Sequence, residues 1–284
     1  MTSNDPTAAV RAVTGSTRIR LEGNDALPLL HRISTQSLVD LTPGHARATL
    51  FCDFRGRLLH RAIVAVTSDR AVWLLRDDAP AADLAAFIDR HVFREDVRMT
   101  VADGAWRVRP VVDSTLAPGT LEEHAAGRMS ARADDDFARI VEPGEPVVDD
   151  AFEPARVRAG RPRHGHEITE DFNPFEVGLA REVHLSKGCF TGQEALMRLI
   201  TYQSVRRRLV RVAGRGEPPS PPCSAVSEGK EVGVLTSAVA DGPGWLGLAV
   251  IRHAALTTPA LSIEERAIEV VEIFPETRPL GLPE

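Results

Sequence analysis

The order of its secondary-structure patterns is the feature that most restricts how this chain can fold. Alternating or β-prone runs predict strands over residues 16–22, 46–51, 58–66, 71–75, 97–101 and 106–112. Between them, one helix is expected to start at Ala26, capped by Gly23–Asp25, and to bury Leu29, Leu30 and Ile33. A second helical pattern covers residues 83–92. Because strands and helices do not alternate as regular βαβ units, the sequence predicts the α+β class.

Towards its end the chain changes from mixed to mainly β patterns. A short helix within a mobile excursion is predicted over residues 114–133, followed by helices over 149–159, ending at Gly160, and 191–200. After Val205, β-prone runs are separated by Pro/Gly-rich turns, which predicts a small barrel or sandwich with strands at 207–212, 231–237, 245–251 and 267–274. We expect two domains, residues 1–204 and 205–284. The proline-rich connector 214–222 is either a loop inside the last domain or its tether, because prolines lack the amide donors of a helix or central strand.

Composition and charge exclude several classes of protein. Hydrophobic residues make up 43% of the 284 residues, and no apolar run approaches the ~20 residues that a membrane helix needs. The first residues lack the basic and apolar regions of a signal peptide, so we expect a cytoplasmic protein. The net charge of −6 argues against general nucleic-acid binding, with Arg206–Arg208 as a local exception.

The cysteines and histidines favour neither a disulfide framework nor a metal site. Cys52, Cys189 and Cys223 lie far apart in the sequence, which indicates free thiols in a reducing compartment. Three scattered thiolates do not form a self-contained iron–sulfur cluster, which normally takes four. The histidine pair of His164-Gly165-His166 lies in a loop rich in glycine and arginine, where we expect it to be solvated.

The segment Lys187–Glu194, with the sequence KGCFTGQE, is the candidate functional site. Its two glycines flank Cys189 and let the backbone approach a ligand closely. Lys187 and the start of the predicted helix would both stabilise a thiolate, the reactive form of cysteine. The competing interpretation is that Cys189 is a small buried apolar residue, as free cysteines usually are.

Other residues of this segment have structural alternatives of the same kind. Thr191 and Glu194 match a capping box, in which each side chain bonds the backbone amide of the other. Arg198 follows Glu194 by one helical turn, so the two form a surface ion pair, or Arg198 reaches a ligand. Lys187 is a surface lysine or a group that attracts an anionic ligand.

The octapeptide resembles the signature of the YgfZ-type folate-binding proteins, relatives of the glycine-cleavage aminomethyltransferase (T-protein), which carry Lys-Gly-Cys-Tyr/Phe-x-Gly-Gln-Glu. Every fixed position of that pattern is met between Lys187 and Glu194. Further matches are Gly23–Ala26 through Ser34–Thr35, Leu50–Arg57 with its Asp-x-x-Gly-Arg turn, Ala159–Pro162, Asn173–Leu179, Arg198 and Gly233–Ser237. The resemblance therefore spans nearly the whole chain.

This resemblance implies a fold, a ligand and a role. The fold would be a GcvT-like three-part ring of two interleaved α+β subdomains plus a C-terminal β-barrel, around a central folate-binding opening. The ligand would be tetrahydrofolate or a derivative, and the role support for assembly or repair of iron–sulfur enzymes, with those enzymes or their assembly factors as partners. Cys189 would be the functionally required residue, and the expected folate-binding residues are Lys187, Gln193, Glu194, Arg198, Phe190 and Phe175.

A folate pocket needs an apolar or aromatic slot and cations at its mouth. Candidates for the slot are Phe172, Phe175, Phe190 and Trp106, and candidates for the mouth are Arg156, Arg158, Arg181 and Arg198. The alternative for each aromatic residue is core packing.

Position 158 departs from the relatives. Where aminomethyltransferases have a glutamate that hydrogen-bonds the pterin, this chain has Arg158, which can only donate. Either another carboxylate, such as Glu153, Glu167 or Glu176, compensates, or folate binds weakly or not at all. Asp53 is expected to stabilise the turn in which it lies.

Three other functions remain open from the sequence. A tetrahydrofolate-dependent aminomethyltransferase or demethylase is the enzyme alternative, against which the missing glutamate counts. A protein-binding scaffold that has lost folate is the second, and Arg158 motivates it. A role on RNA, suggested by Arg206–Arg208, is the weakest, because alternation along a strand sends those arginines to both faces.

Overall fold

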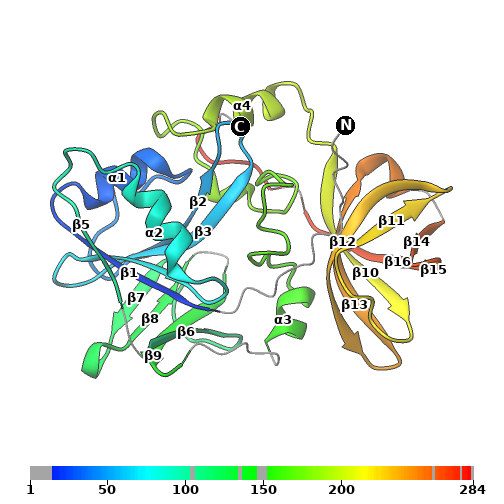
Figure 1. The fold of residues 1–284 in the computed structure, drawn as a ribbon, viewed down its shortest axis with the longest axis horizontal. Coiled ribbons are helices and arrows are strands. Elements are labelled where there is room, and N and C mark those ends of the chain that lie inside the picture. Colours follow the sequence, from blue (N-terminus) through cyan, green and yellow to red (C-terminus); the bar gives the residue numbers. More distant parts are fainter. Residues whose placement is uncertain are drawn as a thin grey trace.

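The computed structural model describes residues 15–102, 106–133, 136–145, 152–257, 260–275 and 277–282. Three antiparallel sheets and a central segment of short helices build the fold (Figure 1). Two sheets lie on one side of the central segment and the third lies on the other. The α+β class predicted from the patterns is confirmed.

The first sheet has five strands, in the order β2-β3-β4-β1-β5. Its strands are β1 (Thr17–Glu22), β2 (Ala46–Cys52), β3 (Leu58–Val66), β4 (Val72–Arg76) and β5 (Arg98–Val101). Helices α1 (Ala26–Ile33) and α2 (Ala81–Asp89) share its core, where the predicted Leu29, Leu30 and Ile33 are buried. Asp25 occupies the N-cap position of α1, but its carboxylate accepts from the Asp96 amide at 2.8 Å instead of capping the helix.

The second sheet corrects a prediction. Residues 114–133, expected to contain a short helix, form a hairpin in which only Ala125–Gly127 is a 3-10 helix, and a strand that the patterns did not predict follows it. The sheet has the order β6-β9-β8-β7 and consists of β6 (Trp106–Val111), β7 (Thr120–Glu123), β8 (Met129–Arg132) and β9 (Ala138–Pro143). It packs on β2 and β3 through Ala48, Ile63 and Val141, so the first two sheets share a core.

The central segment carries α3 (Glu153–Arg158) and α4 (Gln193–Thr201), with a short 3-10 helix at Ala180–Glu182 between them. The predicted start of α3, residues 149–151, lies outside the described residues. The rest of this segment has little regular structure and is fixed by side-chain hydrogen bonds. Figure 1 shows it lying between the first two sheets and the third.

The third sheet has seven strands, in the order β15-β14-β11-β12-β13-β10-β16. The strands are β10 (Arg207–Arg215), β11 (Cys223–Ser227), β12 (Lys230–Asp241), β13 (Gly244–Arg252), β14 (Leu261–Ile263), β15 (Arg266–Ala267) and β16 (Glu269–Ile273). The proline-rich connector is a loop within this sheet, between β10 and β11. The patterns missed β11, β14 and β15, all of which are short.

A buried carboxylate joins the central segment to the third sheet. Glu167 is fully buried and accepts hydrogen bonds from Thr236 Oγ1 (2.5 Å), Ser237 Oγ (2.7 Å) and Arg156 Nη1 (3.1 Å). Arg163 adds its backbone amide at 3.1 Å. The two hydroxyls belong to β12, which explains why a Thr-Ser pair stands inside an otherwise apolar strand.

After β16 the chain returns to the central segment (Figure 1). The Leu280 amide donates to Val183 O at 2.8 Å, and Leu280 O accepts from the Leu185 amide at 2.9 Å. We call residues 274–282 the return segment. Within the described residues, no helix is long and apolar enough to cross a membrane.

Candidate functional site

The loop 185–192 presents Cys189 to solvent. The cysteine is exposed, whereas the next residue, Phe190, is buried and anchors the loop in the core. Gln193 Nε2 donates to Leu185 O at 2.8 Å and closes the base of the loop. The alternative in which Cys189 is a buried apolar residue is therefore wrong.

Lys187 and His31 clamp the start of this loop to α1. Lys187 Nζ donates to His31 O, and its ammonium lies 5.1 Å from the centre of the Phe190 ring. His31 Nδ1 accepts from the Leu38 amide at 3.2 Å, so the ring proton is on Nε2, which donates to Lys187 O at 3.0 Å. Burial and the Lys187 charge lower the pKa of His31, which favours this neutral tautomer.

Burial lowers the pKa of Lys187 to about 8. The unfolded chain would hold that proton up to about pH 10.5, so the stability contributed by this group rises between pH 8 and 10.5. With its ammonium on the His31 carbonyl and the Phe190 ring, Lys187 acts in this structure as a clamp for the loop.

The lysine content of the chain makes this titration measurable. Lys187 and Lys230 are the two lysines of the sequence. In protein labelled with ¹³C-lysine, we expect one side-chain resonance to titrate with a midpoint of about 8. A Lys230→Arg variant should retain that resonance and so assign it to Lys187. A midpoint for Lys187 near the ordinary lysine pKa of 10.5 would show that its ammonium is not desolvated.

The predicted capping box is wrong. Helix α4 begins at Gln193, with Gly192 at the N-cap in a left-handed conformation (φ 84°) and no side-chain cap. The box requires Thr191 at the N-cap, one residue before the N-cap that the structure shows. Glu194 is exposed and pairs with Arg198 at 2.5 Å, which is the surface ion pair that the sequence left open.

The loop's second glycine lies directly against the turn between β2 and β3. A Cβ on Gly192 would come 2.4 Å from Asp53 O and 3.1 Å from Gly56 N, so only glycine fits here. Gly56 in turn lies against Leu196 of α4, where its own Cβ would be 3.0 Å away. The Asp-x-x-Gly-Arg turn and the cysteine loop therefore form one packed unit.

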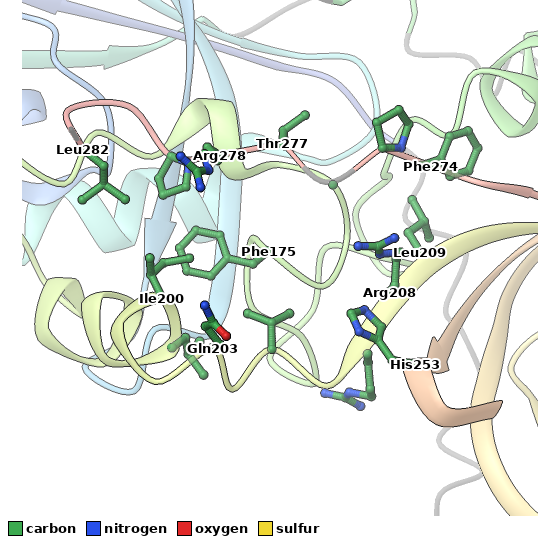
Figure 2. Close-up of a pocket in the computed structure, with 16 residues that line it drawn as sticks. Phe175, Ile200, Gln203, Arg208, Leu209, His253, Phe274, Thr277, Arg278 and Leu282 are labelled. Carbon is green, nitrogen blue, oxygen red and sulfur yellow. The ribbon is translucent and has the colours of Figure 1, made fainter. Parts of the chain in front are cut away.

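A cavity of about 680 Å³ lies between α4, the start of β10 and the return segment (Figure 2). We call it the large cavity. Its apolar side chains include Phe175, Ile200 and Phe274, and its nitrogen-bearing side chains are Gln203, Arg207, Arg208, His253 and Arg278. Of the described residues that line it, none is acidic. The volume is within the ~300–1,000 Å³ range typical of small-molecule sites.

The electrostatics of the large cavity favour an anion. Burial lowers the pKa of Arg208, and burial with the Arg208 charge lowers the pKa of His253. A bound carboxylate would reverse both effects by adding an opposite charge. Arg207 contributes less, because its guanidinium is held by Glu176 Oε1 at 2.7 Å.

A second cavity of about 310 Å³ adjoins the first, and we call it the central cavity. The two share Gly178, Leu209 and three residues of the return segment. The central cavity holds two carboxylates that the sequence reasoning missed, Asp136 and Glu182. Both are engaged by Arg61, at 2.6 and 2.7 Å.

The carboxylate of Asp136 is also held by other arginines. Although burial opposes ionisation, Arg139, Arg161 and Arg61 keep the pKa of Asp136 well below its usual range. In this structure, therefore, its oxygens are committed to protein donors. No short motif marks these residues, because they come from β3, β9 and the central segment.

The sequence-predicted slot and mouth residues are only partly brought together. Phe175 lines the large cavity and Arg181 the central one. Gln193, Glu194 and Arg198 line a shallow groove on the outer side of α4. Neither the large nor the central cavity is lined by Cys189, Lys187 or Phe190.

The other candidates serve the core or the surface. Phe172 is buried under the Arg207 guanidinium, and Trp106 stacks on Arg18 at 4.1 Å. Arg156 is buried and forms an ion pair with Glu167. Arg158 lies on the surface and pairs with Asp241 of β12 at 2.7 Å, so it does not fill either cavity.

The three carboxylates expected to compensate for Arg158 do not line either cavity. Glu153 pairs with Arg156 and Arg163, Glu167 is buried in the contact with β12, and Glu176 accepts from Arg207. Each of the three is paired with a neighbouring arginine, so these two cavities do not support the alternative in which one of them compensates for Arg158.

The expectation of a solvated histidine pair is also wrong. His164 is buried, its Nδ1 donates to Asp78 Oδ1 at 2.8 Å, and its Nε2 accepts from the Arg61 amide at 3.1 Å. His166 Nδ1 lies 2.8 Å from Thr236 O. Both rings thus join the central segment to neighbouring sheets.

Comparison with known proteins defines the class through the fold. A crystal structure of the glycine cleavage system aminomethyltransferase T from Bartonella henselae superposes with a TM-score of 0.77, covering 95% of this chain and 86% of that chain at 18% identity. The chain therefore has the aminomethyltransferase fold. Residues 206–274 match the family described as the CAF17 C-terminal beta-barrel domain, so the third sheet is a barrel of that type. The chain thus combines an aminomethyltransferase-like fold with a C-terminal barrel similar to that of the CAF17 family.

Two curated relatives extend the similarity beyond the barrel. The iron–sulfur cluster assembly factor IBA57 of Mus musculus, a mitochondrial protein, is 26% identical over 93% of this chain and 84% of its own length. A chloroplastic protein of Arabidopsis thaliana, named as a candidate transferase, is 26% identical over 84% of this chain. The chain spans 64% of the length of that Arabidopsis protein.

Proposed function

We propose that this protein is a folate-binding accessory protein of the YgfZ type that supports the assembly or repair of iron–sulfur enzymes in the cytoplasm. The observation that carries the proposal is the exposed Cys189, held on a fixed loop beside α4 in a chain similar to an iron–sulfur assembly factor over most of its length. In this role Cys189 is the reactive residue. Its exposure leaves the sulfur accessible to a partner protein.

The large cavity is the proposed site of tetrahydrofolate. Phe175 and Phe274 supply apolar wall for the ring systems, and Arg208 and Arg278 supply donors for the carboxylates of the glutamyl tail. The absence of acidic groups among the described lining residues suits a ligand with several negative charges. A one-carbon unit is what the folate would supply when bound.

The aminomethyltransferase alternative has less support. Its pterin-binding glutamate is replaced by Arg158, which points to Asp241 on the surface. The carboxylates of the central cavity, Asp136 and Glu182, are paired with arginines and so are poorly placed to accept from a pterin. The scaffold alternative also has less support, because Arg158 fills neither cavity and leaves both open to a ligand.

Two measurements test the proposal. Tetrahydrofolate should bind purified protein saturably, and Phe175→Ala should weaken that binding by about tenfold or more, as expected for loss of an aromatic wall. Cys189→Ala should fold and bind tetrahydrofolate normally. It should fail to restore iron–sulfur enzyme activity in a strain that lacks the gene for this protein. Absence of saturable binding, together with full complementation by Cys189→Ala, would refute the proposal.

A further inference from the structure

The turn between β2 and β3 presents a large aromatic side chain to solvent. Phe54 stands at the tip of this turn and is 77% exposed. Removing an apolar ring of this size from water is favourable, because it lowers the free energy of the system. Aromatic side chains, phenylalanine among them, are enriched at protein interfaces relative to the rest of the surface.

The turn that carries Phe54 is rigid. Asp53 Oδ1 accepts from the amides of Arg55 and Arg57, both at 2.8 Å. The Asp53 amide donates to Arg57 O at 2.9 Å, and Gly56 N donates to Asp53 O at 3.0 Å. Because the backbone is already fixed, docking of Phe54 on a partner costs little additional conformational entropy.

The same turn is packed against the cysteine loop. Gly192 touches Asp53 O and Gly56, as described above, and Cys189 is three residues before Gly192. Three residues of chain reach at most ~11 Å. Cys189 and the turn that carries Phe54 are therefore close enough for one partner protein to contact both.

The neighbour of Phe54 adds charge to this tip. The Arg55 guanidinium lies 5.6 Å from the centre of the Phe54 ring, and its Nε donates to Asp53 Oδ2 at 2.9 Å. Within the described residues, its two Nη groups have no hydrogen-bond partner. They could donate to a carboxylate on a partner protein whose surface also has an apolar pocket for the Phe54 ring.

We propose that Phe54 and Arg55 form the docking anchor for the protein on which Cys189 acts. That partner is a folded protein whose surface offers an apolar pocket for the Phe54 ring, with a carboxylate at its rim for Arg55. This inference rests on the proposed function and adds to it the surface through which the partner is recognised. Membranes and nucleic acids fit less well, because the tip has a single ring and one available guanidinium.

A pair of matched substitutions tests the anchor. Phe93 is 78% exposed, almost the same as Phe54, and lies in the segment after α2, outside the turn. In the strain lacking its own copy, Phe54→Ser should reduce restored iron–sulfur enzyme activity at least about tenfold. Phe93→Ser should leave it within about twofold of the unmodified protein, and Phe54→Trp should restore most of the loss.

Two readouts show that the cysteine loop is intact in these variants. Unfolding midpoints should be unchanged, because both rings are exposed, and the rate at which iodoacetamide alkylates Cys189 should be the same in both. Full activity of Phe54→Ser, or equal losses in Phe54→Ser and Phe93→Ser, would overturn the docking anchor. Full activity of Cys189→Ala in the same strain would instead refute the proposed function, so the two failures are distinguishable.

Discussion

Replacing Glu167 by alanine is expected to lower the free energy of unfolding by about 3–5 kcal/mol. The change removes a fully buried carboxylate and leaves the buried Arg156 guanidinium with only Glu153 as a charged partner. It also leaves the hydroxyls of Thr236 and Ser237 without their shared acceptor. Because these groups join the central segment to the barrel, unfolding should begin at a lower denaturant concentration. The contact between the barrel and the rest of the protein should be lost first.

The matched control for this change is Glu194→Ala. Glu194 also pairs with an arginine, but on the exposed face of α4, where such a pair contributes only about 0.3–0.5 kcal/mol. Urea unfolding followed by circular dichroism measures both variants. A loss of less than about 1 kcal/mol in Glu167→Ala would contradict the buried network described here.

Replacing Gly192 by alanine is expected to cost about 2–5 kcal/mol. The left-handed backbone (φ 84°) accounts for about 1–2 kcal/mol with any other residue. The added Cβ would lie 2.4 Å from the carbonyl oxygen of Asp53, so the turn and the cysteine loop must move apart, at about 1–3 kcal/mol more.

Gly178→Ala separates these two contributions. Gly178 has nearly the same φ, 78°, but a Cβ there would meet nothing within 4 Å. It should therefore lose only about 1–2 kcal/mol in the same unfolding experiment. If the two alanine variants were equally stable, the close approach between Gly192 and Asp53 would not be a real constraint.

The first sheet could be predicted because its strands follow one another with alternating side chains. β1, β2 and β3 begin and end within a residue or two of the sequence patterns. The hairpin of β7 and β8 could not, because its four-residue strands are rich in small and charged residues. Its pairing and burial against β2 and β3 override weak local preference, which is a tertiary effect.

The candidate site shows the same division between local and distant information. The exposed Cys189 loop, its glycines and the Glu194–Arg198 pair follow from adjacent residues and could be predicted. The start of α4 could not, since Thr191 satisfies the capping pattern while contact with Asp53 makes Gly192 the cap. The cytoplasmic location and the two-domain division at residue 204 stay predictions.

The large cavity was beyond sequence reasoning because its walls come from segments far apart in the chain. Phe175, Ile200, Arg208, His253 and Phe274 meet only when the barrel packs on the central segment (Figure 2). The arginine run was recognised as unusual, yet nothing local shows that Arg207 and Arg208 both line the cavity or that Arg207 also pairs with Glu176. Those contacts depend on how β10 packs against the central segment.

The return segment also sets a temporal order for synthesis. Its residues are translated after every other residue that lines the large cavity, including those of the barrel. The first two sheets and the cysteine loop are thus translated before this cavity has its last wall. A small molecule that needs every wall would accordingly bind only after the return segment has packed against the central segment.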